Sequence, residues 1–90
     1  MRVERTLTIV NKLGLHARAA TQLVQLANQF DAQITLVKGE QHANANSVLG
    51  LMLMESHQGE QVEVISEGPD AEAAMDAVES LIAGRFNEAE

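Results

Sequence analysis

Hydrophobic residues change their spacing several times along this chain, and the order of these changes constrains its fold more than any other feature. Residues 3–10 alternate between apolar and polar positions, which predicts a half-buried strand. Residues 17–29 instead place apolar side chains three and four positions apart, which predicts a helix with one apolar face. Alternation returns over residues 33–38, 41–45 and around 62–64, and helical spacing returns over residues 47–55 and 71–82. The predicted order of elements is therefore β-α-β-β-α-β-α.

Turn and capping residues lie at the joints between these elements. Gly39 lies in a polar turn between the second and third strands, and Gly59 lies in another turn just before the fourth strand. Ser47 is expected to cap the middle helix, and Gly68-Pro69-Asp70 is expected to start the last one. Beyond that helix, residues 87–90 are expected to fray.

The length and the order of elements together predict the fold class. With 90 residues, the chain suits one domain with one modest core, which we expect to span residues 1–90. Antiparallel strands with every helix on one face make an α+β fold. We expect an open-faced β-sandwich with a four-stranded antiparallel sheet and three helices on one face.

Composition argues against several classes of function. The net charge is −7, with 13 acidic and 6 basic residues, and Phe30 and Phe86 are the only aromatic residues, so nucleic-acid binding is not expected. The chain contains no cysteine, which suits a reducing compartment. The longest apolar run, residues 48–54, is too short to span a bilayer, and the N-terminus does not resemble a signal peptide. We therefore expect a cytoplasmic protein that binds neither membranes nor nucleic acid. We also expect it to be a monomer.

His16 is the residue best placed for chemistry, because it stands between a glycine-containing loop and an amphipathic helix. The first amides of that helix, those of Ala17 and Arg18, have no partners within the helix and form an anion site together with the helix dipole. The Arg18 guanidinium can also bind phosphate oxygens. The same positive surroundings favour the neutral imidazole, whose lone pair is needed for attack on phosphorus. These residues predict a histidine that accepts a phosphoryl group, although both side chains could also be ordinary polar residues of a helix start.

The segment Gly14-Leu15-His16-Ala17-Arg18-Ala19-Ala20 resembles the active-site signature of the HPr family, the histidine phosphocarriers of the bacterial phosphotransferase system. The strand before it, Ser47 and Gly68-Pro69-Asp70 fall at matching spacings, so the resemblance covers nearly the whole chain. Within the family, residues 11–20 are most similar to the nitrogen-related branch. The family usually has proline at the position of Ala19, and alanine still favours a helix there.

The resemblance implies a protein that carries phosphate between enzymes and is not an enzyme itself. His16 would be phosphorylated at Nδ1 by phosphoenolpyruvate-charged enzyme I, and it would pass the phosphoryl group to a histidine of an enzyme IIA. Arg18 and the amide of Ala17 would hold the phosphate, and no cofactor or metal is implied. Ser47 matches a position that a kinase phosphorylates in some members, while helix capping is the simpler role for it.

The middle helix is apolar almost all round, although a short helix on a sheet buries only one face. By spacing, Leu51 and Met54 share one side, which we expect to be buried. In the HPr family the side next to the active histidine is a docking surface, so we expect an exposed apolar patch there. The expected docking residues are Thr21, Val48, Leu49 and Met52. Burial of the whole helix is the alternative.

Other functions are compatible with parts of this sequence. The chain could be a phosphocarrier of the sugar branch, or an interaction module that keeps the fold without the phosphate cycle. A hydrolase with His16 as general base would need a nucleophile and an orienting acid, and the sequence places neither beside it. A metal site formed by His16, His42 and His57 would lack the usual ligand spacing.

Overall fold

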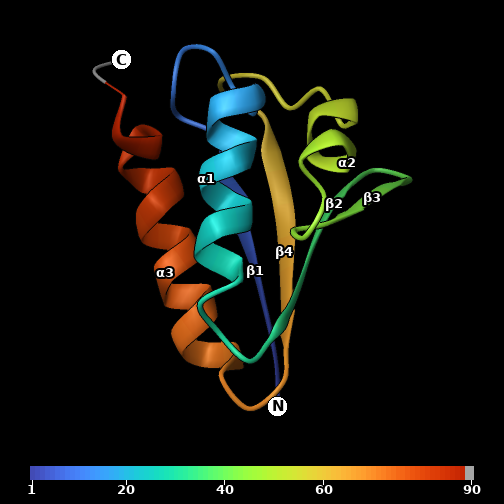
Figure 1. Cartoon of the computed structure of the whole chain (residues 1–90). Coiled ribbons are helices and arrows are strands. Elements are labelled where there is room, and N and C mark those ends of the chain that lie inside the picture. Colours follow the sequence, from blue (N-terminus) through green and yellow to red (C-terminus); the bar gives the residue numbers. More distant parts are fainter. Residues whose placement is uncertain (89–90) are drawn as a thin grey trace.

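The computed structural model describes residues 1–88, and its elements follow the predicted order (Figure 1). They are β1 (Arg2–Thr8), α1 (Ala17–Ala27), β2 (Gln33–Lys38), β3 (Gln41–Asn44), α2 (Val48–Leu53), β4 (Gln61–Glu67) and α3 (Ala71–Ala83), followed by a short turn η1 (Arg85–Asn87). The predicted α+β class and the β-α-β-β-α-β-α order are confirmed, and η1 is an addition to them.

The four strands form one sheet in the order β1-β4-β2-β3. Every neighbouring pair is antiparallel, with Leu7 opposite Val62 between β1 and β4, and Leu36 opposite Val64 between β2 and β4. The predicted four-stranded antiparallel sheet is therefore confirmed. Because β1 and β4 are antiparallel and Thr8 lies opposite Gln61, the loop after β1 lies close to the segment that precedes β4.

The helices cover one face of this sheet, and the other face stays open (Figure 1). Strand residues alternate between buried and exposed, as period-two side-chain geometry requires. The core joins strand residues to helix residues: Leu7, Ile34, Leu36, Val62 and Val64 from the sheet, and Ala20, Leu23, Leu51, Met75, Val78 and Ile82 from the helices. Within residues 1–88, no helix is both long enough and apolar enough to cross a membrane.

Several elements end earlier than their hydrophobic pattern predicts. Strand β1 stops at Thr8, although Ile9 continues the pairing through hydrogen bonds with the backbone of Glu60 and Gly59. Helix α1 ends at Ala27 and helix α2 at Leu53. The backbone after α2 reverses at Glu55, whose φ of 51° cannot continue a right-handed helix.

The end of the chain corrects the prediction of a frayed tail over residues 87–90. Arg85, Phe86 and Asn87 all have positive φ angles and form a tight left-handed turn after α3. The Phe86 side chain is completely buried in the core, and the amide of Glu88 donates to the carbonyl of Arg85 at 2.9 Å. Burial of an aromatic ring holds this turn in place. Residues 89 and 90 lie outside the described residues.

Candidate functional site

The loop between β1 and α1 takes its shape from Gly14, which has a φ of 68°. A Cβ atom at this position would collide with the backbone carbonyl oxygen of Ser56 and lie 3.1 Å from the Cα atom of His57. The next amide, that of Leu15, donates to the same Ser56 carbonyl at 2.9 Å. The side-chain amide of Asn11 donates to the Gly14 carbonyl at 2.7 Å. Glycine is required here both for the backbone angle and for the close approach.

His16 caps the first helix, as its place in the sequence predicts. Its backbone is extended, with φ −79° and ψ −177°, and its carbonyl accepts from the amide of Ala20 at 2.8 Å. Its Nδ1 atom accepts a hydrogen bond from the backbone amide of Arg18 at 3.2 Å. The imidazole therefore takes the place of the Ser, Thr, Asp or Asn side chain that usually satisfies an orphan amide at a helix start.

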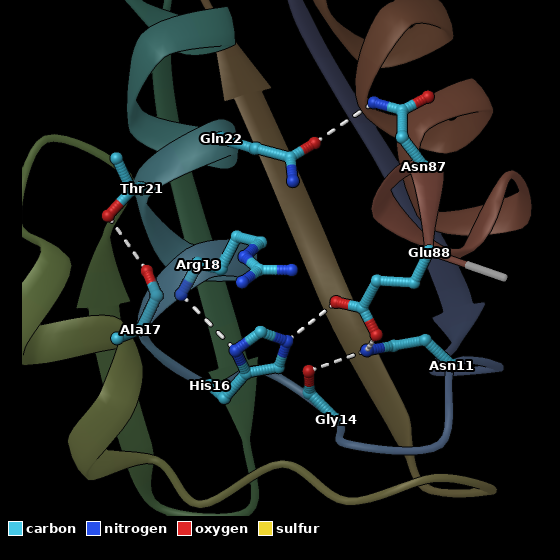
Figure 2. A network of polar contacts seen from close by, with 9 residues as sticks. All are labelled: Asn11, Gly14, His16, Ala17, Arg18, Thr21, Gln22, Asn87 and Glu88. Atoms are coloured by element: carbon cyan, nitrogen blue, oxygen red, sulfur yellow. Dashed lines mark hydrogen bonds and ion pairs between the residues drawn. The ribbon is translucent and has the colours of Figure 1, made fainter. Parts of the chain in front are cut away.

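The other ring nitrogen of His16 contacts a residue from the far end of the chain (Figure 2). Nε2 lies 2.6 Å from Oε2 of Glu88, and Oε1 of the same carboxylate accepts from the Asn11 side chain at 3.2 Å. Because Nδ1 accepts from an amide, the ring proton lies on Nε2 and is donated to Glu88. The contacts thus fix one tautomer, in which the lone pair is on Nδ1.

The electrostatic surroundings of Glu88 match this arrangement. Burial acts to raise the pKa of its carboxyl, but hydrogen bonds from His16 and Asn11, together with the electrostatic influence of Arg18, lower the pKa below its ordinary value. The side chain of Glu88 is 12% exposed and that of His16 is 26% exposed. Glu88 is therefore a partly shielded carboxylate, while the imidazole remains accessible from solvent.

The structure places the predicted phosphate-binding residues on the first turn of α1. Ala17 and Arg18 are both exposed there. In Figure 2 the Arg18 side chain extends over the region between His16 and Glu88. Thr21 is exposed one turn further along, and its hydroxyl donates to the Ala17 carbonyl at 2.8 Å. His16, Ala17 and Arg18 thus form one continuous site at the start of the helix.

Helix α2 divides into a buried and an exposed side, with one correction to the sequence prediction. Leu51 and Met54 are buried, as expected. Leu49 is 66% exposed and Met52 is 37% exposed, also as expected. Val48, however, is partly buried and packs against the core instead of standing on the surface.

Two exposed apolar residues enlarge this patch beyond the expected docking residues. Leu13 is 66% exposed in the loop between β1 and α1, residues 9–16, which we call the active loop after the candidate residue His16. Leu53 at the end of α2 is 65% exposed. An open hollow of about 440 Å³ lies between the loop and α2, and His16, Leu13 and Met52 are among its lining residues. We call the exposed side chains of Leu13, Leu49, Met52 and Leu53 the apolar patch. The imidazole lies at its edge.

Ser47 has the capping role that its position predicts. Its side-chain oxygen accepts a hydrogen bond from the amide of Gly50 at 3.0 Å, and the residue is partly buried.

Within residues 1–88, no group of three or more His, Asp or Glu side chains is arranged to hold a metal ion. His57 lines the hollow beside His16, whereas His42 lies on β3.

Sequence reasoning missed Glu88 and Asn11, the two side chains that organise the imidazole. Glu88 is 72 positions from His16 in the chain, and its segment carries no pattern that predicts order. Asn11 resembles an ordinary loop residue in the sequence, yet it is completely buried. The signal for Asn11 is its spacing of three residues from Gly14, which is typical of a polar side chain that closes its own turn.

Comparison with known proteins agrees with this geometry. A family model described as the PTS HPr component phosphorylation site matches residues 3–84. A phosphocarrier protein NPr from Shewanella violacea is 52% identical over 88 residues, covering 98% of this chain and 97% of that protein. The phosphocarrier protein NPr of Escherichia coli is 44% identical, covering 98% of this chain and 99% of that protein.

Solved structures show the same relationship. The crystal structure of HPr-C-His from Thermoanaerobacter tengcongensis superposes with a TM-score of 0.92 at 41% identity, covering 98% of this chain and 99% of that one. The family model, the curated relatives and this likeness in fold each extend over most of the chain. The chain therefore belongs to the HPr family of phosphocarrier proteins, and its similarity to NPr supports the nitrogen-related branch.

Proposed function

We propose that His16 is the phosphoryl acceptor of this phosphocarrier and that the phosphate is carried on Nδ1. The observation that carries the proposal is the orientation of the imidazole at the start of α1. Its Nε2 side is occupied by Glu88, while its Nδ1 lone pair faces the amide of Arg18 at 3.2 Å. Phosphorus attached to Nδ1 would thus meet the positive end of a helix of 11 residues.

The phosphate is then held by groups that the free imidazole already contacts. Once Nδ1 bears phosphorus, the amide of Arg18 donates to a phosphate oxygen instead of to the ring. The amide of Ala17 and the Arg18 guanidinium supply further donors. These groups are exposed, so they orient the phosphate in a solvated setting where charge interactions are weak. A loosely held phosphoryl group suits a carrier that must release it again.

The partners we propose are enzyme I as donor and an enzyme IIA as acceptor. In-line transfer requires the donor or acceptor atom to approach phosphorus opposite the departing group, so each partner must cover His16. The apolar patch lies beside His16 and offers a docking surface on α2 and the active loop. Thr21, which is exposed on α1, is proposed as a further docking residue. Met52 is a flexible side chain that can adapt to more than one partner. We propose that the protein docks transiently, as a cytoplasmic monomer.

The experiment is phosphorylation with phosphoenolpyruvate and catalytic amounts of enzyme I from the nitrogen and sugar branches, followed by phosphorus NMR. We expect an acid-labile phosphoramidate signal that is absent from His16→Ala. Arg18→Ala should still be phosphorylated, but more slowly, because the acceptor remains and one phosphate ligand is lost. The faster enzyme I identifies the branch.

A different result would favour the interaction module. If the folded protein receives no phosphate from either enzyme I while partners still bind through the apolar patch, the carrier proposal is wrong. His16→Ala separates the two functions, because it removes the acceptor while the apolar patch remains intact.

Phosphorylation of Ser47 is a separate question. A phosphate there would replace the neutral cap of α2 and add about two negative charges near the patch.

A further inference from the structure

The contact between His16 and Glu88 is made by a segment that is anchored at several points. Phe86 is completely buried, and the side-chain amide of Asn87 donates to the side chain of Gln22 at 3.0 Å. The Asn11 side chain binds the second carboxylate oxygen of Glu88. We call residues 84–88 the tail clasp. Figure 2 shows its contacts with α1 and the active loop, and Phe86 anchors it in the core, so the position of the carboxylate is defined by the fold.

The backbone of the tail clasp is strained. Arg85, Phe86 and Asn87 have φ angles of 59°, 51° and 63°, and none of them is glycine. A left-handed conformation is unfavourable for residues with a Cβ atom, and three in succession are unusual. Such strain persists where surrounding contacts hold it, and it concentrates at functional sites. The strained turn delivers one functional group, the Glu88 carboxylate, to Nε2 of His16.

When the phosphoryl group is transferred through Nδ1, the protonation state of Nε2 affects the charge of the ring in both steps. In the first step, the Nδ1 lone pair forms the N–P bond, and the bond between phosphorus and the donor atom breaks with its electron pair leaving on the donor. Nε2 keeps its proton, so the phosphorylated ring gains positive charge. In the second step, the N–P bond breaks and its electron pair returns to Nδ1. If Nε2 is still protonated, the departing group is neutral imidazole; if the proton has been lost, it is the much poorer imidazolate.

We propose that Glu88 is a positioning residue that keeps the proton on Nε2 of His16 through both transfer steps. The inference rests on the proposed function of His16 and adds a role that the sequence motif does not contain. A carboxylate 2.6 Å from Nε2 stabilises the charge that the ring gains on phosphorylation. The arrangement is analogous to the carboxylate that orients and stabilises a catalytic histidine in hydrolases. Glu88 affects the phosphoryl group through the ring and does not contact phosphorus itself.

Other charged groups near the ring occupy different positions. Arg18 lies on the Nδ1 side through its amide. Lys12 and Arg18 line an open hollow that Glu88 also borders. Glu55 and His57 line the hollow between the active loop and α2, which His16 also lines. Among these groups, Glu88 is the one whose carboxylate is hydrogen-bonded to Nε2.

The test compares Glu88→Gln with the matched control Glu72→Gln. Glutamine keeps the length and a hydrogen-bond acceptor but removes the charge, and Glu72 is an exposed residue in the first turn of α3. The phosphorylated proteins are labelled with ¹⁵N in the histidine ring, and protonation of Nε2 is followed by NMR as the pH is raised. Transfer from the phosphorylated protein to enzyme IIA is measured by rapid quench.

For Glu88→Gln we expect the Nε2 proton of phosphohistidine to be lost at a lower pH than in the parent protein. The maximal transfer rate should fall roughly fivefold, because a hydrogen bond to a charged acceptor is about twice as strong as one to a neutral acceptor. The enzyme IIA concentration that gives half-maximal rate should change little. Glu72→Gln should behave as the parent. Glu88→Asp keeps the charge on a shorter side chain and should recover part of the rate.

Two results would overturn the inference. One is a Glu88→Gln protein whose Nε2 protonation and transfer rate both match the parent. The other is a rate loss with unchanged Nε2 protonation, which would make Glu88 a structural or docking residue. Both outcomes leave the proposed function intact, since phosphate would still appear on His16. Failure of the proposed function would be detected earlier, because the parent protein would then receive no phosphate from enzyme I.

Discussion

Gly14→Ala tests whether the active loop is held by its close approach to the segment before β4. The substitution adds one methyl group in a backbone conformation with φ 68°. That methyl group would lie well inside the normal contact distance of the Ser56 carbonyl oxygen, which also accepts from the Leu15 amide. The loop must therefore move away, and the hydrogen bond to Ser56 must lengthen or break. His16 follows two residues later, so it moves with the loop.

The cost has two parts that can be measured separately. The left-handed backbone angle costs about 1–2 kcal/mol once a Cβ atom is present. Loss of the Leu15–Ser56 bond leaves its donor and acceptor unpaired and adds about 1–3 kcal/mol. Gly39→Ala supplies the control, because Gly39 has a similar φ of 61° and, within residues 1–88, a Cβ there would meet no atom within 4 Å beyond its chain neighbours. We expect Gly14→Ala to lose about 2–5 kcal/mol of unfolding free energy and Gly39→Ala about 1–2 kcal/mol.

Urea unfolding measures this difference. With a slope of about 1 kcal/mol per molar urea for a domain of this size, the midpoint of Gly14→Ala should lie at least about 1 M below that of Gly39→Ala. Phosphorylation by enzyme I should slow in Gly14→Ala and stay at the parent rate in Gly39→Ala. Equal midpoints for the two variants would refute the reasoning, because only the backbone angle would then matter and the packing of the loop against Ser56 would contribute nothing.

Three further predictions concern the cap, the patch and the tail. Ser47→Ala should lower the unfolding free energy by about 1 kcal/mol in urea titrations, because the Gly50 amide loses its acceptor; an unchanged midpoint would contradict this. Met52→Asp should raise the half-saturating enzyme I concentration with little change in maximal rate, whereas Thr8→Asp on the open face of the sheet should not. Since the pKa of Glu88 is lowered on folding from its ordinary 4.5, its contribution to stability is present above that pH and is lost as pH falls through the lower folded value. The difference in unfolding free energy between the parent and Glu88→Gln should therefore vanish in acid. A difference that persists at low pH would show that ionisation of Glu88 is not its source.

The outline of the fold and the position of His16 at a helix start could be predicted because both depend on local sequence. Strand and helix periodicity is a property of neighbouring residues, and it specifies the order of elements without knowledge of their packing. His16 precedes a strongly amphipathic helix, so its position at a helix start, beside the amide of Arg18, also follows from nearby residues. The cap at Ser47 is local for the same reason.

The orientation of the His16 ring depends on the tertiary structure. Glu88 reaches Nε2 because α3 packs on the sheet and the buried ring of Phe86 draws the chain end back towards α1. A turn of three left-handed residues without glycine has no local sequence signal, since its conformation is unfavourable until the core supplies the burial energy of Phe86. The partial burial of Val48 also depends on tertiary packing, because it is set by how α2 packs on the core. The sequence by itself thus determined that His16 stands at the start of a helix, and the packing of distant segments decided which of its two ring nitrogens contacts Glu88 and which accepts from the Arg18 amide.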